Sequence, residues 1–181
     1  MSTKEISIVG ICTALIAVIS QISLQLPIGV PLTFQCFIIT VISVVLGFKL
    51  SIFSILSYIL LGFIGLPVFA NFKAGPSAVL GATGGFIIGF LPMAAIIGYA
   101  CDKTQNKIWL FLVLYIGLAI DYMLGILQFA AVTHTEILKA IPIVAQPFLL
   151  KDVILCSIGV LLGLSLKKIL KQSGLFYAKQ V

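Results

Sequence analysis

The sequence GFIGLPVFANFKAGPSAVLGATGGFIIGF, residues 62–90, decides how this chain folds. It leaves one apolar segment, crosses a short polar loop and enters a second apolar segment. The second segment carries three glycines at four-residue spacing: Gly81, Gly85 and Gly89. Glycines four residues apart lie on one face of a helix and let a neighbouring backbone come close within a bilayer. Pro67 and Pro76 bracket the loop and restrict the residues before them to extended conformations, so we expect a short, shaped connection.

The polar loop between the two apolar segments holds Asn71 and Lys73. Gly84 and Gly85 open the segment that follows, and their lack of a side chain lets this helix pack backbone-close to its neighbours. We therefore expect Asn71 to be held at the mouth of tightly packed helices, with the loop forming one wall of a small-molecule pocket.

The composition is that of a membrane protein. Hydrophobic residues make up 61% of the 181 residues, charged residues make up 9%, and the mean hydropathy is +1.28. Soluble domains have about a quarter charged residues. We predict an all-α integral membrane protein formed as a single domain over residues 1–181. The first apolar run follows Lys4 without a small-residue cleavage site, so we expect it to remain as a span.

Apolar segments of about twenty residues predict a compact bundle of six transmembrane helices. We place them at residues 6–26, 33–48, 50–66, 78–101, 108–130 and 143–166. Only a short turn of Gly47, Phe48 and Lys49 separates the second span from the third. No internal repeat is evident, which disfavours an inverted-repeat transporter.

The distribution of lysines predicts the orientation of the bundle. The chain has no arginine, and a cytoplasmic N-terminus places eight lysines on the cytoplasmic side: Lys4, Lys49, Lys103, Lys107, Lys167, Lys168, Lys171 and Lys179. The outer side then receives Lys73, Lys139 and Lys151. By the positive-inside rule, both termini are cytoplasmic. Connections at residues 27–32, 67–77 and 134–146 face outward and carry most of the polar chemistry.

Polar residues inside the predicted spans are candidates for function, because burying them in a membrane is costly. Asp121 lies between Gly117 and Gly125, with Gln128 on roughly the same face. It is either a pocket or relay group or a structural carboxyl bonded to a hydroxyl. Gln21 and Gln25 share a face at the outer end of the first span and have either a ligand role or a helix-contact role.

Asp152 opens the last predicted span from the outside. A carboxylate at this position interacts favourably with the helix dipole, by roughly 0.3–1 kcal/mol. The neighbouring Lys151 points about 100° away around the helix, so we expect the two side chains not to neutralise each other. His134, the sole histidine, is expected to be solvated.

Several catalytic motifs are absent from the sequence. It has no G-x-x-x-x-G-K-[ST] loop, so the chain does not hydrolyse ATP by that route, and no H-E-x-x-H or G-x-S-x-G motif. The four cysteines contain no C-x-x-C pair and are expected to be apolar packing residues: Cys12, Cys36, Cys101 and Cys156. We expect no metal, no cofactor and no enzyme activity.

Four segments together resemble the BioY family, the biotin-binding S components of energy-coupling-factor (ECF) transporters. They are PLTFQ (31–35), GLPVFAN (65–71), GATGGFIIGF (81–90) and PFLLKD (147–152). The resemblance covers essentially the whole chain. It implies a six-helix S-component fold in a prokaryotic cell membrane and capture of biotin at the outer face. It also implies a transmembrane coupling subunit and two cytoplasmic ATPases as partners.

The resemblance also implies two ligand-binding residues, Asn71 and Asp152. The chain departs from the family in having Ala82 and Phe86 where relatives have proline and tyrosine. It also has Leu155 where relatives carry a lysine one turn after the aspartate. Lys73 and Lys151 are therefore both candidates to bind the biotin carboxylate.

The chemistry of biotin fits these residue types. Its ureido ring has one carbonyl acceptor and two N–H donors, which an amide and a carboxylate can pair. Its apolar ring and tail require apolar and aromatic walls. We expect the substrate site to include Asn71, Asp152, Gln35, Phe69, Phe72, Lys73, Gly84, Gly85, Phe86, Tyr122 and Lys151.

The first span carries two small-residue pairs, Gly10 with Ala14 and Thr13 with Ala17. Such pairs allow close helix approach, either to the coupling subunit or within the bundle itself. Other functions remain as alternatives: an S component for another vitamin, or a small membrane enzyme using Asp121, His134 and Glu136. A channel is disfavoured because no ring of like charge recurs.

Overall fold

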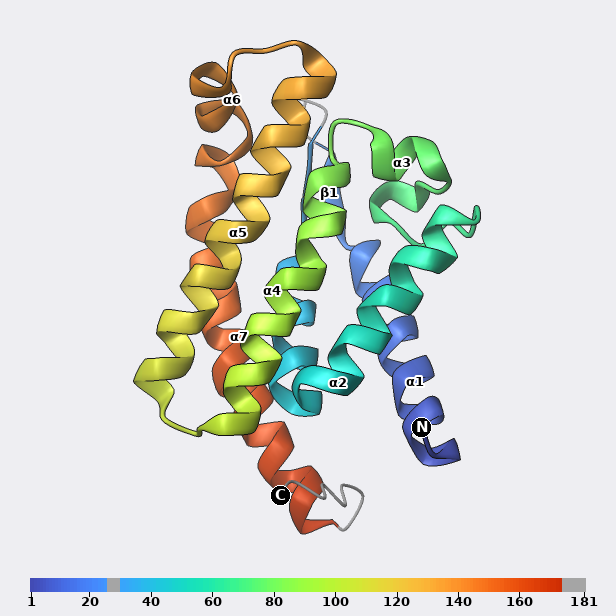
Figure 1. Cartoon of the computed structure of the whole chain (residues 1–181), viewed down its shortest axis with the longest axis vertical. Helices are drawn as coiled ribbons and strands as arrows, with labels where there is room; N and C mark the ends of the chain where they lie inside the picture. The colour runs from blue at the N-terminus through green and yellow to red at the C-terminus, as the bar shows by residue number, and fades with distance from the viewer. Residues whose placement is uncertain (26–29, 174–181) are drawn as a thin grey trace.

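The computed structural model describes residues 1–25 and 30–173, and these residues are mainly helical (Figure 1). The helices are α1 Thr3–Ser20, α2 Gln35–Phe63, η1 Ala70–Phe72, α3 Pro76–Leu80, α4 Gly84–Lys103, α5 Lys107–Thr133, α6 Ile137–Val144 and α7 Gln146–Gln172. Five helices in the described part of the chain are long and apolar enough to cross a membrane: α1, α2, α4, α5 and α7.

The second and third predicted spans correspond to the two arms of α2, which are separated by a sharp bend at Gly47, within the turn predicted between them. Within α2, Gly47 leaves helical geometry with φ +74° and ψ −171°, a conformation that essentially only glycine adopts. Asp102 of α4 stabilises this bend, because its Oδ2 accepts a hydrogen bond from the Phe48 N–H at 2.8 Å. Two arms diverge from the bend, which lies toward the end of the molecule where α1 begins and α7 ends (Figure 1).

The all-α prediction missed a two-stranded antiparallel sheet of β1 (Ser23–Gln25) and β2 (Pro31–Thr33). The first helix therefore ends at Ser20, before the predicted position, because pairing with β2 satisfies the backbone of the next segment. Pro31 begins β2, a place where a strand tolerates proline. Leu26, residues 27–29 of the first outer connection, and Lys179 lie outside the described residues.

Helix α4 packs against α2 and α5 through glycines, as their spacing predicted. A Cβ atom added at Gly85 would overlap the backbone oxygen of Leu124 on α5. One added at Gly98 would lie 2.8 Å from the backbone carbon of Gly47 on α2. The α4 backbone is therefore in direct contact with both neighbours, which fixes the positions of the side chains that α4 presents to the bundle interior.

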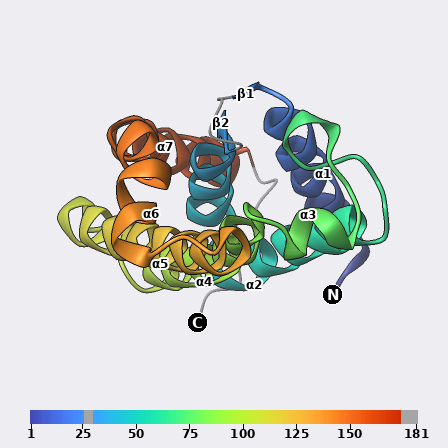
Figure 2. The same cartoon turned by 90° about the horizontal axis from the view of Figure 1, so that it is seen from above.

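Helix α1 packs against α2 and lies at one side of the molecule (Figure 2). Of its two small-residue pairs, Thr13 faces inward and donates a hydrogen bond to the Ser54 carbonyl at 3.0 Å, and Ala17 is half-buried. Gly10 and Ala14 are exposed, and a Cβ added at Gly10 would meet nothing within 4 Å. The pair Thr13 and Ala17 thus contributes to packing within the bundle, whereas the pair Gly10 and Ala14 faces outward.

Candidate ligand-binding cavity

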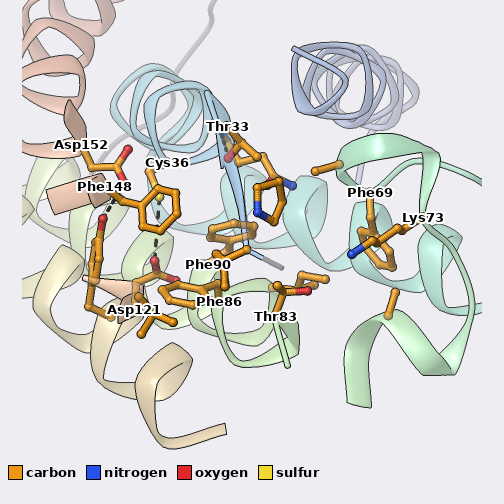
Figure 3. A pocket seen from close by; sticks show the side chains of 18 of the residues that line it. Thr33, Cys36, Phe69, Lys73, Thr83, Phe86, Phe90, Asp121, Phe148 and Asp152 are labelled. Carbon is orange, nitrogen blue, oxygen red and sulfur yellow. Dashed lines mark hydrogen bonds between the residues drawn. The ribbon is translucent and has the colours of Figure 1, made fainter. Parts of the chain in front are cut away.

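A cavity of about 60 Å³ lies at the end of the molecule opposite the start of α1. Its walls come from α2, α4, α5 and α7, from β2 and from the loop that contains η1 (Figure 3). Seven of the eleven predicted substrate residues line it: Gln35, Phe69, Lys73, Phe86, Tyr122, Lys151 and Asp152. Segments far apart in the sequence therefore meet at the place where the outer connections were expected to bind a ligand.

Asp152 is buried in the cavity wall and forms two strong contacts. The Tyr122 hydroxyl donates a hydrogen bond to its Oδ2 at 2.7 Å, and Nζ of Lys151 lies 2.9 Å from its Oδ1. Lys151 also donates to the backbone oxygen of Thr33. The prediction that Lys151 and Asp152 do not neutralise each other was wrong, because a flexible four-carbon side chain bends back across the 100° between adjacent helical positions.

Gln35 is fixed in the wall by a chain of buried hydroxyl groups. Its Nε2 donates to the Tyr58 hydroxyl at 2.8 Å, and this hydroxyl lies 3.0 Å from Oγ of Ser20 on α1. The Tyr58 ring also packs edge-on against Phe69, with ring centroids 5.4 Å apart. The Phe69 ring covers Gly62, where a Cβ atom would overlap it. Tyr58 therefore positions one polar and one aromatic residue of the cavity.

The loop that forms the opposite wall is held by the end of α1. Asn71 and Phe72 have left-handed backbones, with φ 58° and 56°, so the chain reverses sharply. Nε2 of Gln21 donates to the carbonyls of Val68 and Phe69 at 3.1 and 3.2 Å, and its Oε1 accepts from the Phe72 N–H at 3.0 Å. Of the two roles considered for Gln21, the structure shows the contact role.

Asn71 and Phe72 were predicted to contact the ligand, but neither lines the cavity. The Asn71 side chain accepts from Oγ of Ser23 at 3.0 Å and donates to Oε1 of Gln25, so it points toward β1. An asparagine tolerates the left-handed backbone here better than most residues. Phe72 is 70% exposed and points away from the cavity.

Gly84 and Gly85 also lie outside the lining, in the packing layer behind it. A Cβ added at Gly84 would overlap the Val79 carbonyl. Nε2 of Gln128 donates to the carbonyls of Val79 and Gly81, both at 2.8 Å, and so ties α5 to the segment before α4. These glycines position the aromatic residues of α4 and do not themselves border the cavity.

Several lining residues were not predicted from the sequence, among them Phe90 and Phe148. Phe90 lies one helical turn after Phe86, and this four-residue spacing was a usable signal. The Phe86 ring packs edge-on against Tyr122, with centroids 5.7 Å apart. Phe148 belongs to the same PFLLKD segment as Asp152, and Pro147 in the first turn of α7 helps to place it.

The residues of the enzyme alternative are not brought together. Asp121 is completely buried and lines the cavity. His134, by contrast, ends α5 on the surface, and Glu136 forms an exposed ion pair with Lys139 at 3.1 Å. The described residues also contain no cluster of three or more His, Cys, Asp or Glu side chains arranged to hold a metal ion.

The cavity is polar at its ends and aromatic between them. Figure 3 shows Asp121 and Asp152 toward one end, Phe86 and Phe90 in the middle, and Lys73 beside Phe69 at the other end. Lys73 is exposed at the rim. The cavity thus offers carboxyl groups inside and an ammonium group at the mouth, an arrangement suited to an elongated ligand with N–H donors at one end and an acid at the other.

Residues 1–172 of the chain match the BioY family. The chain belongs to the BioY family. The biotin transporter BioY of Thermotoga maritima is 40% identical to it over 161 residues, which cover 88% of this chain and 94% of that protein. The probable biotin transporter BioY of Pyrococcus horikoshii is 36% identical over 163 residues, 90% of this chain and 96% of the relative.

A solved structure, described as the S-component for biotin from an ECF-type ABC transporter, has the same fold. It superimposes with a TM-score of 0.84 over 93% of this chain and 95% of that one, at 24% sequence identity. With its five long apolar helices, this BioY-family chain is a multi-pass protein of the cell membrane. It belongs to a family of transporters rather than to a family of enzymes.

Proposed function

We propose that this chain is the substrate-specificity subunit, or S component, of an ECF-type transporter and binds biotin at the outer face of the membrane. The observation that carries this proposal is the polarity of the cavity, with carboxyl groups inside, aromatic rings between and a lysine at the rim. The names of the two relatives, which match nearly full length, support the same ligand.

The ureido ring of biotin lies at the inner end in this proposal. Asp152 accepts a hydrogen bond from a ring N–H, in addition to its contacts with Tyr122 and Lys151. A carboxylate has about four acceptor sites, so two existing contacts leave capacity for a ligand. The apolar ring packs between Phe86 and Phe148, which contribute aromatic surface to the wall.

The carboxylate of biotin binds Lys73 in this proposal. Lys151, the other candidate, already contacts Asp152 and the Thr33 carbonyl. Lys73 lies at the exposed rim, where an acid retains part of its hydration. Asn71 contributes by holding the sharp turn that presents Lys73 to the cavity, since its side chain bonds to Ser23 and Gln25.

Biotin binding requires the cavity to enlarge. Its volume of about 60 Å³ is well below the range of about 300–1,000 Å³ that is usual for pockets holding small molecules. The wall that moves in our proposal is the loop with Phe69 and Lys73, because the opposite wall consists of packed helices. Movement of this loop outward admits the ligand, and its return closes the site.

The membrane topology follows from the same proposal. Each arm of α2 crosses the membrane, which gives six crossings and places both termini on one side. The lysine distribution makes that side the cytoplasm. The whole chain acts as one domain and binds ligand without catalysing a reaction. A transmembrane coupling subunit and two ATPases supply the energy, and the coupling subunit docks on the outward face of α1 at Gly10 and Ala14, close to Ala17.

Ligand binding by the purified full-length protein tests the proposed function. Radiolabelled biotin is titrated into protein reconstituted in lipid vesicles, with lipoate, thiamin and riboflavin as competitors. We expect saturable biotin binding that a large excess of the other three compounds does not displace. Displacement by one of them would assign the cavity to another vitamin, and ATP hydrolysis above that of a mock preparation would contradict the non-enzymatic role.

A further inference from the structure

Asp121 is the second carboxyl group of the cavity, and its surroundings differ from those of Asp152. It lies in α5 and is completely buried. The Sγ of Cys36 is 3.8 Å from its Oδ2, a long contact with a weak donor. Its Oδ1 has no hydrogen-bond partner among the described residues, and neither of the described ion pairs includes Asp121.

Helix α4 leaves room for this carboxyl group. A Cβ atom added at Gly89 of α4 would overlap Oδ1 and lie 2.9 Å from Cα of Asp121, so the glycine allows both the close approach of the two helices and the placement of the carboxyl group. An unsatisfied buried carboxyl group is unfavourable for folding. The ligand-free protein therefore gains no stability from Asp121 that an apolar residue could not provide.

Buried polar groups within membrane spans most often mark a ligand or ion pathway. The described residues lining this cavity include no acidic side chains besides Asp121 and Asp152. Asp152 already contacts Tyr122 and Lys151, whereas Asp121 retains nearly all of its hydrogen-bonding capacity. The two carboxyl groups lie toward the same end of the cavity (Figure 3).

We propose that Asp121 contacts the ligand and accepts a hydrogen bond from the second N–H of its cyclic urea, while Asp152 accepts from the first. This inference rests on the proposed function, because it assigns one carboxyl group to each ureido N–H. The terminal torsion of an aspartate is broad, so either oxygen of Asp121 can turn toward the ligand. Asp121 is therefore a specificity residue, because a ligand ring that lacks one N–H leaves the carboxyl group of Asp121 unpaired.

The substitution Asp121→Asn separates this role from a structural one. We expect the biotin dissociation constant to rise about ten- to a hundred-fold, since an amide replaces the acceptor and leaves a buried N–H of the ligand unsatisfied. The melting temperature of the ligand-free protein should change little, because one poorly satisfied buried polar group replaces another of the same size. Binding within two-fold of wild type, or a variant that no longer folds, would overturn the proposal.

A second variant tests the same carboxyl group without removing it. Gly89→Ala places a methyl group that overlaps Oδ1 and lies 2.9 Å from Cα of Asp121, so we expect it to displace this residue and weaken biotin binding about ten-fold. Thermal melting in parallel shows whether the packing of α4 on α5 is retained. Gly10→Ala on α1 is the matched control, because its Cβ atom would meet nothing within 4 Å and affinity should stay within two-fold of wild type. Equal affinity of Gly89→Ala and Gly10→Ala for biotin would contradict the proposal.

Biotin methylated at one ureido nitrogen distinguishes a ligand contact from a structural role of Asp121. Only a ligand contact makes the loss of affinity caused by methylation depend on Asp121. In the wild type, methylation at either nitrogen should weaken binding. In Asp121→Asn, methylation at one of the two nitrogens should have almost no further effect. Equal penalties in both proteins would overturn the inference while leaving the proposed function intact. Failure of the wild type to bind biotin would instead refute the proposed function.

Discussion

The two walls of the cavity are built differently. On the helix wall, Asp152, Lys151 and Tyr122 contact one another and belong to long helices of the bundle. The loop wall carries Phe69 and Lys73 on a short connection with two left-handed residues, held by the Gln21 side chain at the end of α1. Opening the helix wall requires packed helices to separate, whereas opening the loop wall requires the buried Phe69 ring to leave Tyr58 and Gly62.

This difference explains how a cavity of about 60 Å³ can serve a larger ligand. Moving the helix wall would separate buried charges, which is strongly unfavourable. Moving the loop wall breaks a few partly exposed hydrogen bonds that water can replace, and it exposes one buried ring, Phe69. Variants that affect one wall and leave the other intact therefore test whether the two walls have different roles.

The largest effect is expected from Gly85→Leu, which disrupts the packing behind the helix wall. A Cβ at this position already overlaps the Leu124 carbonyl and lies 2.9 Å from Cβ of Gln128, so α4 and α5 must separate. We expect loss of detectable biotin binding and a markedly lower melting temperature. Gly10→Leu is the matched control, because its Cβ would meet nothing within 4 Å and binding should stay at the wild-type level.

The same pair of variants tests whether Gly85 packs against α5 and whether Gly10 faces the coupling subunit. Wild-type affinity in Gly85→Leu would contradict the tight packing of α4 on α5. In vesicles that contain the coupling subunit and ATPases, Gly10→Leu should abolish uptake although it still binds biotin. Normal uptake by Gly10→Leu would exclude this face of α1 as the docking surface.

The second largest effect is expected from Asp152→Asn, which changes recognition on the helix wall. Loss of a charge-assisted hydrogen bond to the ligand corresponds to about ten- to more than a hundred-fold weaker binding. Asp152 lies in the second turn of α7, not at its predicted place at the helix start, and a role limited to the helix dipole would leave affinity within a few-fold. Titration of biotin, with thermal melting to verify folding, distinguishes these outcomes. A folded Asp152→Asn protein with wild-type affinity would refute the assignment.

Some features of the two cavity walls could be predicted from the sequence. Packing at Gly85 followed from residue spacing, because four-residue repeats place glycines on one helix face regardless of the rest of the fold. The lining residue Asp152 followed from the resemblance to a family. These features depend on local periodicity or on matched motifs.

Other features depended on side-chain reach and on single backbone angles, which spacing does not determine. The Lys151–Asp152 ion pair required the lysine to bend back along its helix. The geometry of the bend in α2 depended on the backbone angles of Gly47 and on the hydrogen bond from Phe48 to Asp102 of α4. The orientation of Asn71 toward β1 depended on a small sheet that composition did not predict.

The smallest effect on affinity is expected from Gln21→Leu, which loosens the loop wall. The substitution keeps a similar volume but removes the hydrogen bonds to the Val68 and Phe69 carbonyls and from the Phe72 N–H. Gln21 is only half-buried, so water replaces part of these bonds and each lost bond costs about 0.5–1.5 kcal/mol or less. The folded protein should therefore remain stable.

If the loop wall is the part that opens, Gln21→Leu should change rates more than affinity. A looser loop opens more often, so the association and dissociation rate constants should both rise while the dissociation constant changes less than about five-fold. Asp152→Asn, by contrast, should raise mainly the dissociation rate constant, as most losses of a ligand contact do. Stopped-flow measurement with a fluorescent biotin separates the two patterns. Unchanged rate constants in Gln21→Leu would show that biotin enters without movement of this loop, and the difference between the two walls would then lie in recognition alone.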